Sequence, residues 1–454
     1  MTPKLKKTPP SPLAPVEFDI PKPFKTMLEN GLDVVLFEDK RLPLVSYRLA
    51  FHSGDANDPS EHTGLSSAIA SMLTEGTEDY TSRQFAEKIE RLGAGLSASS
   101  SEDFTIIAAS ALSLYSSEVL HLLAEVVLRP VFPEDELDLY RRNTVEHLKF
   151  QRSQSPFLAG EQAVRLIYGD HPYARISPAA ADVEKLDRNM MSKFHASTFI
   201  PNNAMLIAVG DVERDDFLSE VNDLFGDWQQ GTVPAQKFPS PPARDGRTLT
   251  LVDRPDSAQS NIVLGNLAIN RTDADYFPVL VMNQVLGAGA SSRIFMNLRE
   301  EKGYTYGAYT RLNTKRLAGD IEATAEVRNE VTGESLKEFF YELERIRESN
   351  VGDDELADAK SFLTGVFPIR AETQEGLTNL IVNQHLYGLP ENYLQTYRAN
   401  IDAVTVADVK RVAGAYVRPD EMAIVIVGDA TQVLPQVKAY ADAVEVYDTE
   451  GNKK

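Results

Sequence analysis

An arginine and a tyrosine lie seven positions apart in the stretch SSRIFMNLREEKGYTYGAY, which runs from Ser291 to Tyr309. The guanidinium of Arg299 offers forked donors that can hold backbone carbonyls, and the hydroxyl of Tyr306 can donate to an oxygen that gains negative charge during a reaction. A purely structural interpretation also fits, because a cation often stands in the last turn of a helix and aromatic residues are common in strands. The local pattern leaves both interpretations open.

The spacing of apolar residues in this stretch predicts a short helix followed by a strand. The buried side of the helix would consist of Ile294, Phe295 and Leu298, with Ser291 or Ser292 at its N-terminus. Gly303 stands where a helix commonly ends in a left-handed turn. After it the period changes to two, so that Tyr304, Tyr306 and Ala308 would share one face of a strand. Across this reversal the side chains of Arg299 and Tyr306 are expected to converge on one point.

With its upstream neighbours included, LGAGASSRIFMNLREEKGYTYGAY resembles the second-domain signature of the pitrilysin/insulinase (M16) metallopeptidases, in which an Arg and a Tyr at this spacing contact the substrate. The resemblance continues upstream through VDRPDSAQSNIVLGNL, from Val252 to Leu267, and in outline covers nearly the whole chain. It implies that Arg299 and Tyr306 serve at a peptidase site.

The zinc motif of that family is degenerate in this chain. TGLSSAIASMLTEGT, from Thr63 to Thr77, predicts a helix whose buried side consists of Leu65, Ile69, Met72 and Leu73. M16 peptidases carry their inverted zinc motif, H-x-x-E-H, on this helix and a further glutamate ligand on a later one. Aligned through the matching TGL, the three positions of the motif are occupied by Ser67, Ala70 and Ser71. Leu148 stands at or beside the position of the family's later glutamate ligand.

These side chains do not suit a zinc ion. Zinc binds imidazole, thiolate or carboxylate groups, whereas a neutral serine hydroxyl is a poor ligand and alanine cannot take a proton from water. Glu61 and His62 precede the helix and are expected in a loop, and Glu146 with His147 cannot supply a full site. We therefore expect no metal and no cofactor in this chain.

Other candidate sites are weaker. Histidines are scattered without a close ligand pair, at His52, His121, His147, His171, His195 and His385. Of these, His171 in GDHPYA is expected to shape a loop. LGAGA, from Leu286 to Ala290, lacks the Lys and Ser/Thr of a phosphate-binding loop, and no serine stands in a G-x-S-x-G elbow.

Length and composition limit the class of protein. A chain of 454 residues with 43% hydrophobic and 25% charged residues is too long for one core and ordinary for a soluble globular protein. A net charge of −21 argues against a nucleic-acid partner and is compatible with basic peptides. No apolar run is long enough to span a bilayer. The absence of cysteine fits either redox compartment and leaves the localisation unknown. The sequence as given predicts a cytoplasmic protein, and a removed leader would make it periplasmic.

An internal repeat divides the chain. IPNNAMLIAVGDV, from Ile200, aligns with RPDEMAIVIVGDA, from Arg418. The predicted parts are an extended N-terminal arm (1–22), a first domain with the degenerate zinc site (23–228), a Pro-rich linker (229–246), a second domain with the Arg/Tyr motif (247–446) and a polar tail (447–454).

Strands mixed with helices of many lengths predict an α+β fold, with two homologous domains that each have a largely antiparallel sheet and helices packed on one face. The resemblance implies the same architecture. Early strands are predicted at Leu32–Asp39 and Leu44–Gly54, joined through Lys40–Pro43 by a hairpin or a short loop.

Three functions remain open. The first is a non-catalytic subunit that places Arg299 and Tyr306 at the zinc site of a partner chain, an M16 homologue with which it forms a heterodimer, or a homodimer in the partner's absence. Its substrate would be a peptide or an unfolded polypeptide, and the zinc would belong to the partner. The second is a scaffold or peptide-binding protein without proteolytic activity. The third is a stand-alone hydrolase of unknown chemistry.

Overall fold

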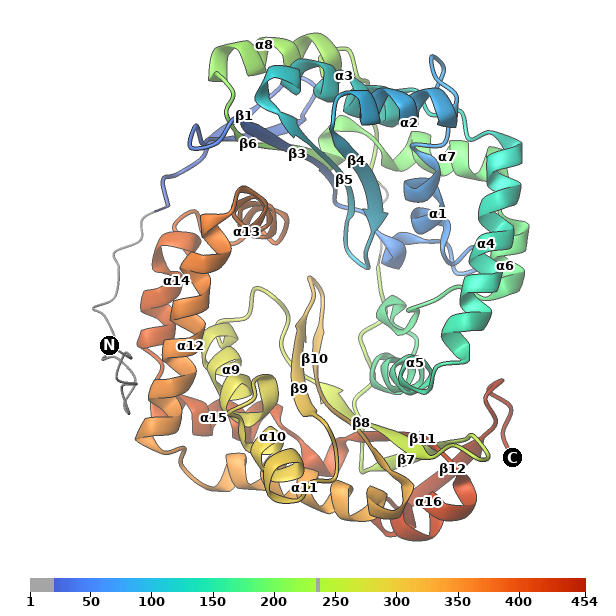
Figure 1. Ribbon diagram of the computed structural model, residues 1–454, viewed down its shortest axis with the longest axis vertical. Coiled ribbons are helices and arrows are strands. Elements are labelled where there is room, and N and C mark those ends of the chain that lie inside the picture. Colours follow the sequence, from blue (N-terminus) through green and yellow to red (C-terminus); the bar gives the residue numbers. More distant parts are fainter. Residues whose placement is uncertain (1–19, 234–236) are drawn as a thin grey trace, which may run out of the picture.

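Two six-stranded sheets face each other in the computed structural model, which describes residues 20–233 and 237–454 (Figure 1). In spatial order the first sheet consists of β1 (Phe24–Met27), β2 (Asp33–Glu38), β6 (Ala204–Gly210), β3 (Leu44–Phe51), β5 (Thr105–Leu112) and β4 (Gly95–Ser100). The second consists of β12 (Ala443–Tyr447), β7 (Thr248–Asp253), β11 (Ala423–Gly428), β8 (Gln259–Leu267), β10 (Gly319–Arg328) and β9 (Ala308–Thr314). The predicted α+β fold with two homologous domains is confirmed.

Most neighbouring strands are antiparallel. The parallel pairs are β2 with β6 in the first sheet, and β7 with both β11 and β12 in the second. Because β6 lies between β2 and β3, the segment Lys40–Pro43 is a short loop and not the turn of a hairpin. The aligned repeat segments form β6 and β11, which occupy equivalent central positions in the two sheets.

Most helices of each half pack on the outer face of its own sheet, and one helix of each half lies instead on the inner face of the other sheet (Figure 1). Those of the first half are α1 (Leu65–Met72), α2 (Ser82–Arg91), α3 (Ser116–Leu128), α4 (Glu134–Arg152), α5 (Ser155–Tyr168), α6 (Ala180–Lys185), α7 (Arg188–Thr198) and α8 (Arg214–Phe225). Those of the second half are α9 (Tyr276–Asn283), α10 (Arg293–Phe295), α11 (Thr332–Glu348), α12 (Asp353–Glu372), α13 (Gln374–Leu386), α14 (Tyr393–Asp402), α15 (Val406–Tyr416) and α16 (Ala430–Val437).

The inner face of each sheet is covered by a helix from the other half. Helix α13 packs on β3 and β6 of the first sheet, where Ile381 lies with Val35 and Ile207 in one buried cluster. Helix α5 packs on β8 and β11 of the second sheet through Ala159 and Ala163. The two halves are therefore joined by buried apolar surface as well as by their linker.

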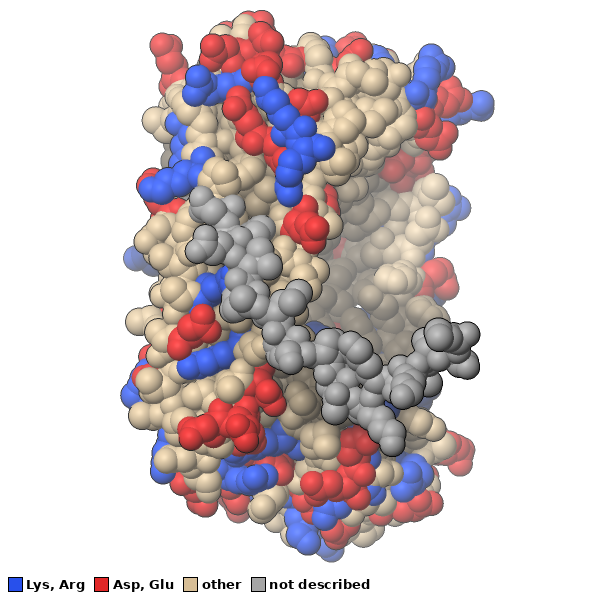
Figure 2. Space-filling model, turned by 60° about the vertical axis from the view of Figure 1, so that its left-hand side comes forward, with Lys and Arg blue, Asp and Glu red and all other residues tan. Residues whose placement is uncertain are grey.

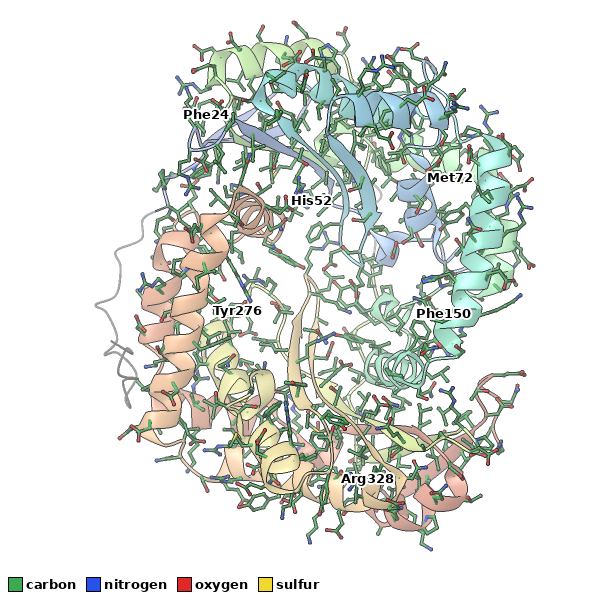
Figure 3. The ribbon with its side chains drawn as sticks, viewed as in Figure 1. Phe24, His52, Met72, Phe150, Tyr276 and Arg328 are labelled. Carbon is green, nitrogen blue, oxygen red and sulfur yellow. The ribbon has the colours of Figure 1, made fainter. Side chains whose placement is uncertain are left out.

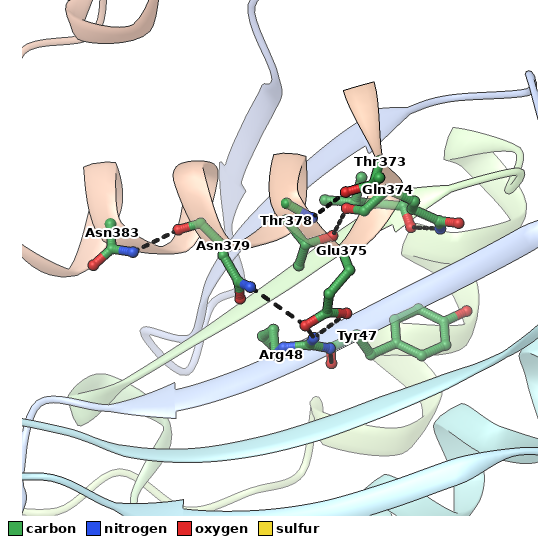
Figure 4. A network of polar contacts seen from close by, with 10 residues as sticks. Tyr47, Arg48, Thr373, Gln374, Glu375, Thr378, Asn379 and Asn383 are labelled. Carbon is green, nitrogen blue, oxygen red and sulfur yellow. Dashed lines mark hydrogen bonds and ion pairs between the residues drawn. The ribbon is translucent and has the colours of Figure 1, made fainter. Parts of the chain in front are cut away.

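A hydrogen-bonded ion pair anchors α13 to the first sheet (Figure 4). The guanidinium of Arg48, on β3, is only 8% exposed and donates to both carboxylate oxygens of Glu375 at 2.6 and 2.7 Å. It also donates to the carbonyl of Tyr47 at 2.9 Å, and Gln374 donates to the carbonyl of Val209 at 2.7 Å. These contacts fix the first turn of α13 against the sheet.

We expect Glu375→Ala to lower the free energy of unfolding by roughly 1–3 kcal/mol, because it leaves a buried guanidinium without its carboxylate. Asn379→Ala is the matched control, since Asn379 lies one turn further along α13 and contacts Glu375 at 3.4 Å. That change should cost less than about 0.5 kcal/mol. Denaturant unfolding of both variants measures the difference. Equal losses would show that the Arg48–Glu375 pair contributes nothing of its own.

The described chain begins with a residue that is packed between the halves. Ile20 is buried in the cluster under α13, and its carbonyl accepts a hydrogen bond from Gln395 of α14 at 2.7 Å. The first 19 residues of the predicted arm lie outside the described residues. Within the described ranges no helix has both the length and the apolar character needed to cross a bilayer. Figure 2 shows acidic and basic side chains interspersed over both halves, with a hollow between them.

Candidate functional site

The segment that carries Arg299 and Tyr306 has an unusual helical geometry. Two π-helical segments, η5 (Gln284–Ala288) and η6 (Met296–Glu301), lie on either side of the single turn α10. Such wide turns are rare and are found frequently at functional sites. The predicted helix is thus present, although its second part is π-helical. The predicted left-handed turn is confirmed, because Gly303 has a φ of +63°.

Arg299 is held only loosely by its neighbours. It lies in η6, its Nε is 3.4 Å from a carboxylate oxygen of Glu300, and its guanidinium lies 4.9 Å from the ring centre of Phe295. Leu298, the preceding residue, is fully buried. The helix backbone, anchored by Leu298, therefore determines where the guanidinium of Arg299 lies.

Tyr306 does not lie on a strand, which corrects the prediction made from the alternating pattern. Strand β9 begins two residues later, at Ala308, and the side chain of Tyr306 is 91% exposed. The reason lies in Thr305, whose hydroxyl donates to the carbonyl of Glu326 on β10 at 2.7 Å, lies 2.9 Å from the carbonyl of Gly307 and accepts from the Gly307 N–H at 3.1 Å. This local turn takes the place of the ladder bonds of a strand.

The degenerate zinc positions lie on α1 and α4, which contact each other (Figure 3, where Met72 marks the end of α1 and Phe150 the last turn of α4). The Ser67 hydroxyl donates to Asp55, with its two carboxylate oxygens at 3.0 and 3.1 Å, and the Ser71 hydroxyl donates to the carbonyl of Ser67 at 2.9 Å. Ala70 and Leu148 are buried and apolar. Serine hydroxyls that are engaged in this way do not form a metal-binding set.

Two buried carboxylates stand beside α1. Burial raises the pKa of Asp55. Burial, together with the charge of Asp55, raises the pKa of Asp58 to about 7. Asp58 accepts from the backbone N–H groups of Gly64 and Ser66 at 2.7 and 2.9 Å, so its carboxylate satisfies the free donors at the start of α1. Asp58 is therefore part of the helix cap.

The residues here do not fit the zinc ion that the M16 resemblance implies for this position. A catalytic zinc needs three protein ligands with nitrogen, sulfur or carboxylate donors and one open position. Of the aligned positions, two carry hydroxyls and two carry hydrocarbon side chains. Across residues 20–233 and 237–454, no group of three or more His, Cys, Asp or Glu side chains is arranged to hold a metal ion.

Two of the histidines named in the sequence analysis, His171 and His195, serve a loop and the packing of a helix. The prediction for His171 is confirmed: it is buried, and its Nδ1 accepts from the backbone N–H of Tyr173 at 3.1 Å. Burial lowers the pKa of His171 to about 4. His195, on α7, stacks on Phe199 with ring centres 4.6 Å apart, and its Nε2 is 2.9 Å from the carbonyl of Val127.

We expect His195 to make the chain acid-sensitive. Burial lowers its pKa from 6.5 to about 4, so its stabilising contribution is complete above pH 6.5 and is lost as the pH falls towards 4. The full loss is on the order of 3 kcal/mol. Unfolding free energies measured from pH 7.5 to 4 should fall less steeply for His195→Gln than for the wild type. The same substitution at the exposed His147 is the control, and identical slopes in all three proteins would contradict the expectation.

A contact between the two halves lies near the centre of the molecule and was missed at the sequence level. The turn between β4 and β5 carries Glu102 and Asp103, and the equivalent turn between β9 and β10 carries Lys315 and Arg316. Lys315 pairs with Glu102 at 2.7 Å, and the Arg316 N–H donates to Asp103 at 2.8 Å. The opposite charges in these equivalent turns of the two repeats are a sequence signal from which this contact could have been predicted.

Tyrosines of the first half complete this contact. The Tyr173 hydroxyl donates to Asp103 and accepts from the Leu317 N–H at 3.1 Å. The Tyr168 hydroxyl donates to Asp320 of β10, which also accepts from Asn313 at 2.7 Å. The strand that follows Tyr306 is therefore fixed at its far end to the first half.

Comparison with known proteins gives two family-model matches. A model described as "Insulinase (Peptidase family M16)" matches residues 33–171, and one described as "Peptidase M16 inactive domain" matches residues 185–363. A Helicobacter pylori protein named "Non-peptidase homolog YmxG" is 24% identical over 398 residues, which cover 87% of this chain and 91% of that protein. A Bacillus subtilis protein named "Uncharacterized zinc protease YmxG" is 21% identical over 368 residues, which cover 79% of this chain and 88% of that protein.

Solved structures show the same fold. The crystal structure of a peptidase M16 inactive domain from Pseudomonas fluorescens has a TM-score of 0.84 at 26% identity and covers 89% of this chain and 98% of that chain. A protease from Helicobacter pylori has a TM-score of 0.83 at 21% identity, covering 90% of this chain and all of that one.

Proposed function

Because the chain belongs to the M16 peptidase family but carries Ser67, Ala70, Ser71 and Leu148 where that family holds its zinc, we propose that it is the non-catalytic subunit of a two-chain M16 zinc endopeptidase. Its partner would be a zinc-bearing M16 homologue. The substrate would be a peptide or an unfolded polypeptide held between the two chains.

The observation that carries the proposal is that the metal-binding residues are lost while the Arg/Tyr pair is kept. The metal-binding positions are replaced by hydroxyl and hydrocarbon side chains, yet Arg299 and Tyr306 are both present at the family spacing. The side chain of Tyr306 is almost wholly exposed, so its hydroxyl is free to meet a substrate. A scaffold would have no use for this pair.

In the proposed complex each residue has a separate role. The partner's zinc, when bound, activates water and polarises the scissile carbonyl. The hydroxyl of Tyr306 donates to the carbonyl oxygen as negative charge builds on it, which lowers the barrier. The guanidinium of Arg299 holds backbone carbonyls of the substrate through two of its donors.

The alternative is an M16-like scaffold or peptide-binding protein without proteolytic activity. The name of the similar Helicobacter pylori protein, "Non-peptidase homolog YmxG", supports it. The two functions differ in whether the mixture of this chain with a zinc-bearing homologue cleaves peptides faster than the homologue alone.

The test is co-expression with an M16 homologue that retains H-x-x-E-H, followed by elemental analysis, light scattering and a peptide-cleavage assay. We expect this chain alone to hold no stoichiometric zinc and to cleave nothing, and the mixture to form a heterodimer that cleaves. One tightly held zinc per chain, lost on Ser67→Ala/Ser71→Ala, would overturn the proposal. So would a strict monomer both alone and with the partner.

A further inference from the structure

The segment between η5 and β9 has no sheet pairing to fix it. From Ser291 to Gly307 it consists of one α-helical turn, a π-helical segment and an extended stretch, and none of these forms ladder bonds. A π-helical turn is itself less favourable than an α-helical one. Its far end is tied to β10 by the Thr305 hydroxyl, which donates to the carbonyl of Glu326 at 2.7 Å. The position of Arg299, earlier in the segment, must therefore be set by side chains that tie it to the helices beneath it.

Arg293 provides the strongest of these ties. Its side chain is 5% exposed, and its Nε and Nη2 donate to the two carboxylate oxygens of Glu355, both at 2.8 Å. Such a bidentate pair fixes orientation as well as distance. The guanidinium of Arg293 keeps the pKa of Glu355 below its usual value, so the carboxylate is charged.

Glu355 is itself fixed. It lies in the first turn of α12, and its Oε2 also accepts from the backbone N–H of Gly352 at 2.8 Å. A second tie runs to α11, because the buried Asn297 donates to Glu338 and Glu342, each at 3.0 Å. Arg299 follows these anchored residues directly and makes only the weak contacts described above.

We propose that Arg293 is a positioning residue, which through its ion pair with Glu355 holds the π-helical segment Met296–Glu301 so that Arg299 meets the substrate. The contact of Arg299 with the substrate rests on the proposed function, whereas the ordering of the segment Met296–Glu301 by Arg293 does not. Arg293 itself, being buried, does not touch the substrate.

Two variants break the Arg293–Glu355 ion pair, each by changing one of its two partners. Glu355→Gln removes the negative charge, and Arg293→Met keeps the length and apolar stem of the side chain while removing its donors. Because Arg293→Met leaves the Glu355–Gly352 bond in place, an effect shared by both variants cannot come from the cap of α12. Glu375→Gln is the matched control, since it weakens a similar bidentate arginine pair between the halves of the molecule.

Native-state hydrogen exchange on the full chain is the first measurement and needs no partner. We expect exchange of the backbone amides at positions 297–304 to be at least about tenfold faster in both variants, because loss of one strong hydrogen-bonded pair lowers the free energy of local opening. The amides of β10 and α11 should be unchanged. The control Glu375→Gln should leave positions 297–304 unchanged. Unchanged exchange in both variants, or equal acceleration over the whole second half, would overturn the proposal.

The second measurement is peptide affinity of the two-chain complex. Glu355→Gln should weaken it as much as Arg299→Ala does, and the double variant should be no weaker than Arg299→Ala alone, because both act through one guanidinium. Losses that multiply in the double variant would refute a positioning role. If no complex cleaves or binds peptide, the proposed function fails, whereas the exchange experiment still decides the ordering role of Arg293.

Discussion

Exchanging Tyr306 for phenylalanine is expected to lower kcat/KM of the two-chain complex by roughly 10²–10³, the usual cost of losing one donor to a developing oxyanion. The change removes only the hydroxyl. Because the side chain is almost fully exposed and contributes nothing to either core, the fold and the assembly should be unaffected. The loss should therefore appear in turnover, with an unchanged melting temperature and heterodimer yield.

Two further variants make this result specific. Tyr309→Phe is the matched control, since Tyr309 lies three residues further on, is partly exposed and packs against Phe295 with ring centres 5.4 Å apart. It should leave turnover unchanged. Arg299→Ala should chiefly weaken peptide binding. Undiminished kcat/KM in both Tyr306→Phe and Arg299→Ala, at matched complex concentration, would favour the scaffold interpretation.

Local chemistry explains which features could be predicted from the sequence. Helix α1 follows from apolar residues at helical spacing, and the left-handed turn at Gly303 follows from the conformational freedom of glycine. The repeat predicted two equivalent sheets because β6 and β11 are continuous buried strands, each followed by Gly-Asp. The loss of the zinc ligands was visible because serine, alanine and leucine carry no imidazole, thiolate or carboxylate donor, whatever the fold around them.

Features that depend on distant partners could not be predicted in this way. The alternating residues from Tyr304 to Tyr309 fit a strand, but the hydroxyl of Thr305 bonds backbone groups of Gly307 and of Glu326 on β10, and β9 begins only at Ala308. Helices α5 and α13 each bury apolar residues, but their sequences do not indicate that each helix covers the sheet of the other half. The Arg293–Glu355 pair joins residues 62 positions apart. Such contacts become visible only once the two repeats are packed.

Removing the carboxylate of Asp103 is expected to lower the free energy of unfolding by roughly 2–5 kcal/mol, because two donors lose their acceptor at about 1–3 kcal/mol each. Asp103 is buried, and it accepts from the hydroxyl of Tyr173 and from the backbone N–H of Arg316 at 2.8 Å. Burial raises the pKa of Tyr173, so its hydroxyl remains a donor and would lose its acceptor in Asp103→Ala. The backbone donor of Arg316 would lose its acceptor at the same time.

The neighbouring Glu102 supplies the comparison. It lies on the same turn and pairs with Lys315 of the opposite half, but it is partly exposed, so Glu102→Ala should cost less than about 1 kcal/mol. Denaturant unfolding measures both losses. Because β9 begins two residues after Tyr306 and ends at this contact, Asp103→Ala should also lower the activity of the complex. Equal losses for the two variants would mean that the contact is an ordinary surface ion pair and that α5 and α13 alone hold the halves together.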